Sequence, residues 1–576
     1  VVIFEAAIRY ENLFIRVDVL VKDGKCFDLI EVKAKSVGAG ESFLNKDGAL
    51  KAVWESYVDD VAFQYYVLGK AFPGHTIRPF LFLANKDAVA SVDKLNQKFL
   101  IRRRGKDYEI KVNPAIPLGD KILLQRPVER EVAAVLAGWR TLAGKEYDFP
   151  GFVEELSRAY NEDRKIDSPL GAKCRDCEFY TTADDGPGKK SGFKECWEKQ
   201  AKFSEADFKA PTVLTIWNFR KKDAFIQQKK YFQKDLSRAD LEGKTAQDHD
   251  KPGLSNVDRQ ELQIQAAKSG KDSLYLDKKG LKAEMDRWRF PLHFIDFETC
   301  MVAIPFYKGA NPYQQIVFQF SHHVVEENGA VGHQGQWLNV EPGKFPNFDF
   351  VRTLRKDLEG DRGTIFRYAP HENTVLNQVY DQLGESKEKD RNELRAWIKT
   401  ITKSTGKSGE SWEGERNMVD MLELVRRYYF DPACEGSNSI KAILPSVLRR
   451  SRFIQEKYSK PVYGKDIQSL NYSGQVWVKK DAAGIVQDPY RLLPDVFAGY
   501  TVEELDRFFS NDELAEGGAA MTAYAMMQFS EMTGEERQAL SKALLKYCEL
   551  DTLAMVMIYE AWKDWVEGSG EKEGEG

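Results

Sequence analysis

The sequence contains no apolar run long enough to cross a membrane, and no segment typical of a secretory signal. Its seven cysteines are an odd number, which argues against the paired disulfides of a secreted framework. We therefore expect a cytoplasmic protein without a membrane partner. The chain begins with Val1 inside an apolar segment, so we expect residues ahead of it to be missing.

A strongly basic composition is also absent, since the formal net charge is −5. No P-loop pattern G-x-x-x-x-G-K-[ST] occurs, so any unwinding of nucleic acid would need a partner helicase. Neither absence excludes a nuclease, because carboxylates that bind metals lower the net charge and basic residues can cluster locally. With 42% apolar and 12% aromatic residues, the composition is that of a folded globular chain.

The 576 residues are enough for two or three domains, and the pattern changes along the chain. Residues 1–200 alternate strand-like and helix-like segments and end in a cysteine cluster. Residues 201–285 are rich in Lys, Asp and Gln and predict a helical connector, and residues 286–566 predict a second α/β region. Residues 567–576 are rich in Gly and Glu, which is typical of a disordered tail.

The segment 292–299, LHFIDFET, predicts a buried strand that ends in two carboxylates, Asp296 and Glu298. Alternate residues of a strand share a face, so the two acids point the same way. Burying two like charges together is unfavourable, and a divalent cation removes the repulsion. Oxygen-only ligands suit Mg²⁺ or Mn²⁺. The alternative is a solvent-facing pair with lysine partners, which the apolar neighbours disfavour.

Two further segments could complete such a site. Glu372 follows a strand predicted over 363–370 and opens a helix, where the helix dipole alone could explain a glutamate. Tyr547 and Asp551 are four residues apart in a long helical pattern, so they share a face. This pair offers one more ligand and a phenol that could orient an attacking water, although an ordinary amphipathic helix is the alternative for Tyr547.

Together these residues resemble the DnaQ-like (DEDD) exonuclease superfamily, tyrosine subtype, which has an RNase H-like fold. Asp296 and Glu298 match its first motif, Glu372 stands at the second, where Asp is usual, and Asp551 with Tyr547 matches the third. The chain also resembles a bacterial family called domain of unknown function 2779. The segments that carry this second resemblance are 294–299, 311–314, 318–322, 436–441 and 547–555. The resemblance implies 3′–5′ phosphodiester hydrolysis at a two-metal site.

The segment 436–445 predicts a loop that caps a helix, with Ser437 or Ser439 as the N-cap residue. Exposed amides at such a helix start can bind phosphate, and Lys441 could hold the nucleic-acid backbone. Plain helix capping explains the same pattern equally well.

The first region predicts a second nuclease-like core. Asp18 lies on one strand of a predicted hairpin, and Glu31 and Lys33 lie two residues apart on the next. The carboxylates could bind Mg²⁺ while the lysine positions water. Glu5 precedes them on a predicted helix, and Gln64 lies on a helix that follows. This order resembles the RecB-like branch of the PD-(D/E)xK nucleases, with a restriction-endonuclease-like core. The alternative is a catalytically inactive structural core.

Cys174, Cys177 and Cys196 form the cysteine cluster, and the C-x-x-C step allows two thiolates to bind one metal centre. RecB-like relatives, including CRISPR-associated and AddB types, hold a [4Fe–4S] cluster with three late cysteines and one ahead of the nuclease core. The resemblance therefore implies such a cluster, with its fourth ligand in the missing N-terminal part and Cys26 as the early alternative. Zn²⁺ is the rival occupant, and three free thiols are the remaining alternative.

The sequence as a whole predicts an α/β multi-domain protein that joins a PD-(D/E)xK core to a DnaQ-type exonuclease domain. We expect a role in DNA processing, repair or defence, with DNA favoured over RNA as the substrate. The alternatives are an RNA 3′-end exonuclease and a non-catalytic nucleic-acid-binding subunit of a larger complex.

Overall fold

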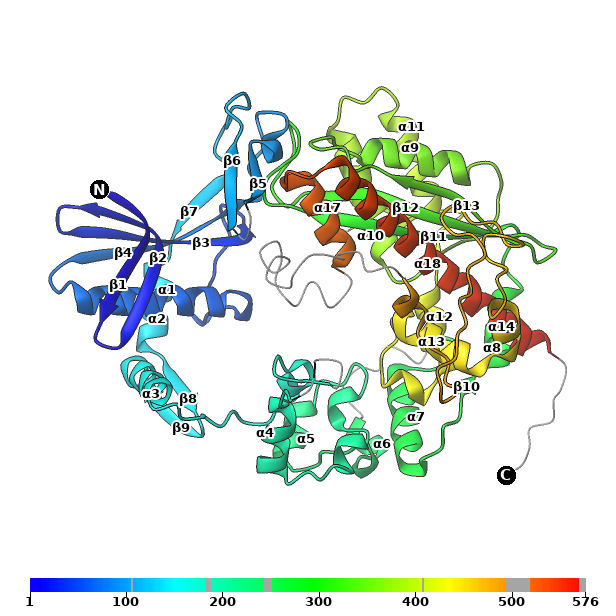
Figure 1. Ribbon diagram of the computed structural model, residues 1–576, viewed down its shortest axis with the longest axis horizontal. Helices are drawn as coiled ribbons and strands as arrows, with labels where there is room; N and C mark the ends of the chain where they lie inside the picture. Colours follow the sequence, from blue (N-terminus) through cyan, green and yellow to red (C-terminus); the bar gives the residue numbers. More distant parts are fainter. Residues whose placement is uncertain are drawn as a thin grey trace. The chain divides into compact units, whose positions relative to one another are not determined.

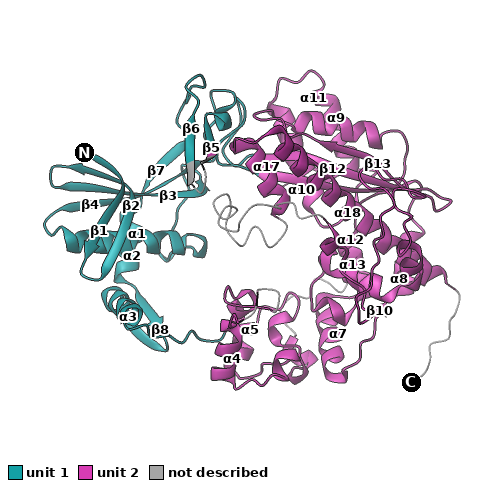
Figure 2. Cartoon of the chain, viewed as in Figure 1, with its two compact units in different colours: residues 1–100, 109–170, 301–314 teal, residues 101–108, 171–300, 315–576 magenta. Residues whose placement is uncertain are grey.

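The computed structural model describes residues 1–104, 107–182, 186, 188–241, 251–406, 409–493 and 518–568 (Figure 1). The chain divides into two compact units (Figure 2). The first contains residues 1–100, 109–170 and 301–314, and the second contains residues 101–108, 171–300 and 315–576. Both combine helices with sheets of mixed strand direction, so the predicted α/β multi-domain class is confirmed.

These units divide the chain at places other than the predicted domain boundaries. The cysteine cluster, predicted with the first region, lies in the second unit, and so does the connector over 201–285. Residues 569–576 of the predicted tail lie outside the described residues. Within the described parts, no helix combines the length and apolar character that a membrane crossing needs.

The first unit is built on a five-stranded sheet with the order β1-β2-β3-β4-β7. Its strands are β1 (Val2–Tyr10), β2 (Leu13–Asp23), β3 (Cys26–Val37), β4 (Thr76–Asn85) and β7 (Leu123–Pro127). The predicted hairpin is confirmed as the antiparallel pair β2–β3, and β4 runs parallel to β3. Helix α1 (Ala52–Ala71) connects β3 to β4 and buries Trp54, Val58 and Val61 in the same core as Leu29 and Leu81.

The predicted helix around Glu5 is wrong, because this segment is strand β1. Ala6 and Ile8 are buried, while Glu5, Ala7 and Arg9 are exposed, and this period of two is that of a strand with one buried face. Pairing with β2 fixes the register, with Phe4 opposite Val19 and Ala6 opposite Val17.

Smaller elements complete the first unit. They are β6 (Asp107–Val112), which pairs with β5 (Phe99–Arg104), then α2 (Glu129–Ala137), β8 (Trp139–Leu142), β9 (Lys145–Asp148) and α3 (Phe149–Asn161). Strands β5 and β6 continue across the division into the second unit.

The second unit is built on a five-stranded sheet with the order β13-β12-β11-β14-β17. Its strands are β11 (Leu292–Met301), β12 (Gln315–Val325), β13 (Val331–Leu338), β14 (Ile365–Arg367) and β17 (Val419–Asp420). Strands β12 and β13 are antiparallel, whereas β11, β14 and β17 are parallel. The strands predicted over 292–299 and 363–370 are therefore present as β11 and β14, at the centre of the sheet.

Strand β11 contributes to two hydrophobic cores, one on each face of the sheet. Ile295 and Phe297 pack with helices α9 (Asn347–Leu358), α10 (His371–Glu385) and α11 (Arg391–Ile401). Leu292 and Phe294 pack with α12 (Met421–Tyr428), α13 (Ile440–Arg450), α14 (Arg452–Tyr458) and α18 (Gly534–Glu567). Alternation along the strand thus turns residues 294, 296 and 298 toward the α18 side. Figure 1 shows α18 running across the sheet.

The connector region folds as short helices that pack within the second unit. They are α5 (Lys222–Gln227), α6 (Arg238–Leu241), α7 (Asn256–Ser269) and α8 (Lys278–Met285), and α4 (Gly192–Ala201) comes directly before them. Buried Arg259 on α7 donates to the carbonyl of Tyr429 at 2.5 Å and to the side chain of Asn438. Because residues 429–438 lead into α13, this arginine fixes the start of that helix.

Candidate metal centre

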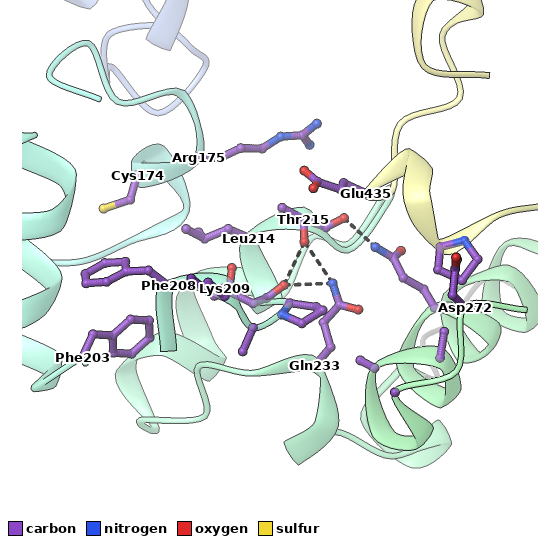
Figure 3. Close-up of a pocket in the computed structure, with 18 of the residues that line it drawn as sticks. Cys174, Arg175, Phe203, Phe208, Lys209, Leu214, Thr215, Gln233, Asp272 and Glu435 are labelled. Carbon is purple, nitrogen blue, oxygen red and sulfur yellow. Dashed lines mark hydrogen bonds between the residues drawn. The ribbon is translucent and has the colours of Figure 1, made fainter. Parts of the chain in front are cut away.

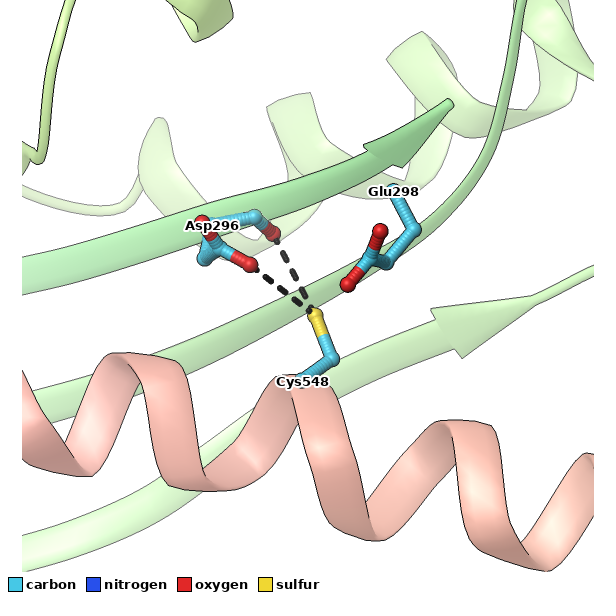
Figure 4. Close-up of side chains that lie close together, drawn as sticks. All are labelled: Asp296, Glu298 and Cys548. Carbon is cyan, nitrogen blue, oxygen red and sulfur yellow. Dashed lines mark hydrogen bonds between the residues drawn. The ribbon is translucent and has the colours of Figure 1, made fainter. Parts of the chain in front are cut away.

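Strand β11 and helix α18 bring three potential ligands together. One oxygen of Asp296, one of Glu298 and the Sγ of Cys548 all lie within 4.8 Å of one another (Figure 4). The Cys548 thiol is 3.5 Å from Oδ2 of Asp296 and 3.7 Å from its carbonyl oxygen. Cys548 is fully buried, and its sulfur faces the acids of β11.

The two other predicted acids, Asp551 and Glu372, lie outside this group of three ligands, but their charges act on Asp296 and Glu298. Asp551 lies one turn after Cys548 on α18, and its Oδ1 accepts a hydrogen bond from the phenol of Tyr490 at 2.5 Å. Glu372 lies in the first turn of α10 and is only 2% exposed. Within the described part of the chain, its Oε2 has no hydrogen-bond partner. A buried, unpartnered carboxylate oxygen is costly, and a bound cation would remove that cost.

The charges of the neighbouring acids shift the pKa values of Asp296 and Glu298. Burial raises the pKa of Asp296 well above its usual range, and the charges of Asp551, Glu372 and Glu298 raise it further. Burial, then the charges of Asp551 and Glu372, raise the pKa of Glu298 in the same way. Burial raises the pKa of Asp551 to about 6 and that of Glu372 to about 8. This electrostatic arrangement fits a divalent cation bound by oxygen ligands.

Two tyrosines and a lysine surround Asp551. The Nζ of Lys441 lies 5.4 Å from the ring centre of Tyr547 and 5.8 Å from that of Tyr490. Its positive charge lowers the pKa of both Glu298 and Asp551, against the effect of burial. Burial raises the pKa of both tyrosines, so both phenols are neutral and can donate a hydrogen bond.

Sequence reasoning missed Tyr490. It lies on a short 3-10 helix, Pro489–Leu492, far from the other site residues in the sequence, and no local pattern marks it. Only the folding of that segment over α18 brings its hydroxyl to Asp551.

Ser439 occupies the predicted N-cap position of α13, but its side chain makes no capping hydrogen bond. Instead, the hydroxyls of Ser437 and Ser439 lie 3.2 Å apart, and the amide of Ser439 donates to the Ser437 hydroxyl at 3.3 Å. Plain side-chain capping therefore does not account for these serines. They remain predicted substrate contacts near Lys441, which lies in the first turn of the same helix.

A strained turn presents Glu372 to the centre. Ala369 has a φ of 83°, which is unfavourable for a residue with a Cβ, and Asp420 holds it there. Oδ1 of Asp420 accepts from the amide of Ala369 at 3.0 Å, and Oδ2 binds the buried guanidinium of Arg367 at 2.8 Å. Asp420 thus holds the turn that leads into Glu372.

Replacing Asp420 with Asn should lower the free energy of unfolding by about 1–2 kcal/mol, the difference between charged and neutral hydrogen bonds to Arg367. Urea denaturation would measure this loss. Asp277 caps α8 by accepting from the amide of Gly280 at 2.8 Å, but bonds no arginine in the described part of the chain. The Asp277→Asn variant is therefore the matched control, and an equal loss in both variants would contradict the role given to the Arg367 pair.

In the first unit, Glu31, Lys33 and Gln64 meet as predicted. Lys33 Nζ lies 2.6 Å from Glu31 Oε1 and 2.6 Å from Asp60 Oδ2. Gln64 donates to Glu31 Oε2 at 2.8 Å and to Asp60 Oδ1 at 3.1 Å. Burial raises the pKa of Glu31 although Lys33 and Gln64 lower it. Asp60 was not predicted, but it lies one turn before Gln64 on α1, and this i,i+4 spacing was the available signal.

Asp18 and Glu5 form contacts outside this group. In the β2–β3 pairing Val19 lies opposite Ile30, so Asp18 and Glu31 are the next neighbours along the two strands. Asp18 accepts from the amide of Val32 at 2.7 Å, and Glu5 forms an exposed ion pair with Arg16 at 2.6 Å. Among the described residues, Glu5, Asp18 and Glu31 do not place three oxygens within 4.8 Å of one another.

The three cysteines of the predicted cluster are half-buried. Cys174 lies on the 3-10 helix Ala172–Asp176, Cys177 follows it, and Cys196 lies on α4. Burial raises the pKa of Cys174, and the neighbouring thiols of Cys177 and Cys196 raise it further. In the described parts, the three sulfurs do not all come within 4.8 Å of one another. They supply three of the four ligands that Zn²⁺ or a [4Fe–4S] cluster uses.

Cys174 also lines a cavity of about 560 Å³ inside the second unit (Figure 3). The cavity wall combines the aromatic rings of Phe203 and Phe208 with polar Gln233 and Thr215, and Gln233 donates to Thr215 at 3.0 Å. The cavity lies beside the cysteine cluster and contains none of the four carboxylates of the metal centre.

The fold is that of a mixed α/β protein, and two acids of β11 and the thiol of Cys548 could together hold a metal ion. Residues 293–439 match the family model described as domain of unknown function (DUF2779), so the resemblance to that family is confirmed over this segment. The match contains Asp296, Glu298 and Glu372 and ends at Ser439, before Tyr547 and Asp551. No curated protein and no solved structure matches the chain.

Proposed function

We propose that the second unit is a Mg²⁺- or Mn²⁺-dependent 3′–5′ exonuclease that acts on DNA ends. The observation that carries this proposal is a group of four acids: oxygens of Asp296 and Glu298 lie together on β11, and the charges of Glu372 and Asp551 act on both. Such a group is unfavourable without a cation, and its members come from the three segments that the DEDD resemblance requires. The direction of cleavage and the preference for DNA come from that resemblance.

Each side chain has a role that its position supports. The four carboxylates would hold the metal ions, which when bound supply a hydroxide and stabilise the charge of the in-line transition state. The neutral phenol of Tyr547 would orient the attacking water. Lys441, with Ser437 and Ser439 at the start of α13, would hold a backbone phosphate of the strand.

The sheet gives a second line of support. Strand β11 lies between β12 and β14, with an antiparallel pair on one side and parallel strands on the other. This order is compatible with an RNase H-like sheet, in which the central strand carries the first acidic motif. Asp296 and Glu298 lie on one of two neighbouring parallel strands, and Glu372 follows the other, which supports a shared site at that edge of the sheet.

For the first unit, we propose a RecB-like PD-(D/E)xK nuclease site at Glu31 and Lys33. The buried network with Asp60 and Gln64 supports it, because the lysine lies beside a carboxylate that would bind Mg²⁺. Asp18 and Glu5 would have to turn from their present partners to join. The cysteine cluster would hold a [4Fe–4S] centre or Zn²⁺, and a helicase or another complex subunit would supply unwound DNA.

A cleavage assay with end-labelled substrates tests both sites. Single- and double-stranded DNA and RNA, labelled at the 3′ or the 5′ end, are incubated with Mg²⁺, Mn²⁺ or EDTA. We expect stepwise shortening from 3′ ends of DNA, lost in EDTA and in Asp296→Ala. The Glu31→Ala variant should keep this stepwise shortening and lose only a second cleavage pattern.

The alternatives predict different outcomes of the same assay. Faster shortening of RNA than of matched DNA would indicate an RNA 3′ exonuclease. Tight binding of substrate without metal-dependent cleavage would indicate a non-catalytic binding subunit. Shortening by Asp296→Ala at the wild-type rate would refute the assignment of the site.

A further inference from the structure

The thiol of Cys548 is a ligand of a different kind from the acids around it. Cys548 and Asp551 are three residues apart on α18, so they project from the same side of the helix toward β11. The sulfur lies 3.5 Å from Oδ2 of Asp296, and Figure 4 shows it directed between the two acids of that strand. The centre therefore offers a soft sulfur donor beside hard oxygen donors.

The spacing suits a single small cation. In a tetrahedral zinc site with Zn–S of about 2.3 Å and Zn–O of about 2.0–2.2 Å, ligand atoms lie roughly 3.6 Å apart. The Cys548 sulfur and the nearer Asp296 oxygen already have this separation, and the oxygen of Glu298 is within 4.8 Å of both.

Whether the sulfur of Cys548 binds the metal depends on which cation is present. Mg²⁺ requires oxygen ligands in octahedral geometry and leaves a thiol uncoordinated. Zn²⁺ and related thiophilic ions bind thiolates strongly and accept four ligands. The oxygens of Asp296 and Glu298 and the sulfur of Cys548 supply three of these four ligands.

We infer that Asp296, Glu298 and Cys548 form a site for a thiophilic divalent cation such as Zn²⁺, which displaces Mg²⁺ and blocks cleavage. On binding, the thiol loses its proton to solvent and a sulfur–metal bond forms, with no change of oxidation state. The inference rests on the proposed function only for its consequence, inhibition. The binding of the cation through sulfur is independent of any nuclease activity.

Cobalt(II) is the probe, because it replaces zinc and gives a near-ultraviolet charge-transfer band only when thiolate is bound to it. The metal-free full-length protein is titrated with Co²⁺ under anaerobic conditions, as wild type, Cys548→Ser and Asp296→Asn. Cys434→Ser is the matched control, since Cys434 is also buried but its sulfur contacts the carbonyl of Ala442. The cysteine cluster contributes equally to all four spectra.

We expect Cys548→Ser and Asp296→Asn each to lose the part of the charge-transfer band that comes from cobalt bound to Cys548. The Cys434→Ser variant should keep this part. The activity of each protein in excess Mg²⁺ is measured as a fraction of its own rate without Zn²⁺. The Zn²⁺ concentration that halves this activity should be at least roughly tenfold higher for Cys548→Ser than for wild type. A cobalt spectrum of Cys548→Ser that overlays that of wild type would overturn the inference. So would a full band in Asp296→Asn, which retains the thiol and tests the site even if the serine variant misfolds.

The two proposals fail in different ways. A protein that cleaves no nucleic acid but shows a cobalt band dependent on Cys548 would refute the exonuclease and keep the thiophilic site. An active exonuclease with identical cobalt spectra in wild type and Cys548→Ser would refute the thiophilic site alone.

Discussion

Replacing Asp296 with Asn is expected to slow Mg²⁺-dependent 3′ shortening of DNA by on the order of 10³-fold. The carboxylate lies at the centre of the site, and the charges of the three other acids act on it. A bound metal contributes several kcal/mol to stabilisation of the transition state, and each 1.36 kcal/mol changes the rate about tenfold. Asn keeps the size of the side chain, so the loss would come from the missing charge. Single-turnover rates on 3′-labelled single-stranded DNA would measure it.

The matched control is Glu413→Gln, which neutralises an exposed acid on β16 (Ser411–Glu413) in the same unit. Its rate should equal that of wild type. Circular dichroism of both variants would show whether the fold is retained. A fall of less than about tenfold in a folded Asp296→Asn protein would be too small for the loss of a metal ligand and would contradict the role of this residue.

Replacing Glu372 with Gln is expected to stabilise the metal-free protein at neutral pH, by on the order of 3 kcal/mol at pH 7. Burial raises the pKa of Glu372 to about 8, and the charges of Asp420 and Asp551 add to the increase. At pH 7 the folded protein must therefore keep this carboxyl protonated, whereas the unfolded chain ionises it. The amide removes that difference because it cannot ionise.

The sign of the pH dependence follows directly. The folded pKa lies above the ordinary value of 4.5, so the contribution of Glu372 to stability is complete below pH 4.5 and is lost as the pH rises through about 8. The advantage of Glu372→Gln should thus be absent near pH 4.5 and largest at pH 8. Urea unfolding in EDTA at several pH values would measure it, with Glu413→Gln as the control.

Adding a divalent metal ion should make the wild-type protein more stable than the Glu372→Gln variant. Mn²⁺ binds the folded wild type and stabilises it, most strongly at pH 8, where protons no longer compete for the ligands. The Glu372→Gln variant lacks one ligand and should gain less. Burial lowers the pKa of His322 and His323, so these histidines make the protein more stable as the pH rises, opposite to Glu372. Wild type and variant are therefore compared with each other at the same pH. If wild type and Glu372→Gln were equally stable at pH 8 without metal, Glu372 would not destabilise the metal-free protein, and this prediction would be refuted.

The parts of the site that could be predicted are those whose signal is local. The acids of β11 share a face because strands alternate, and Tyr547 and Asp551 share a face because helices repeat every 3.6 residues. Both patterns are visible within ten residues of sequence. The helix predicted around Glu5 was wrong because a local pattern of so few residues fits either a helix or a strand. Only pairing with β2 shows that this segment is a strand.

The parts that could not be predicted depend on segments that meet only after folding. Tyr490 reaches Asp551 across 61 positions of sequence, and Asp60 reaches Lys33 across 27. Cys548 follows Tyr547 in an ordinary helical pattern, and nothing local distinguishes a thiol that packs in the core from one that faces a carboxylate. The difference is made by the packing of α18 against β11.

By itself, the sequence determined which short segments form strands and helices and which acids share a face, because periodicity and side-chain type act over a few residues. It also carried the family resemblance that residues 293–439 confirm. Only the tertiary structure decided that four carboxylates and a thiol share one electrostatic environment. Their repulsion and burial depend on distances through space, which the order of residues along the chain does not fix.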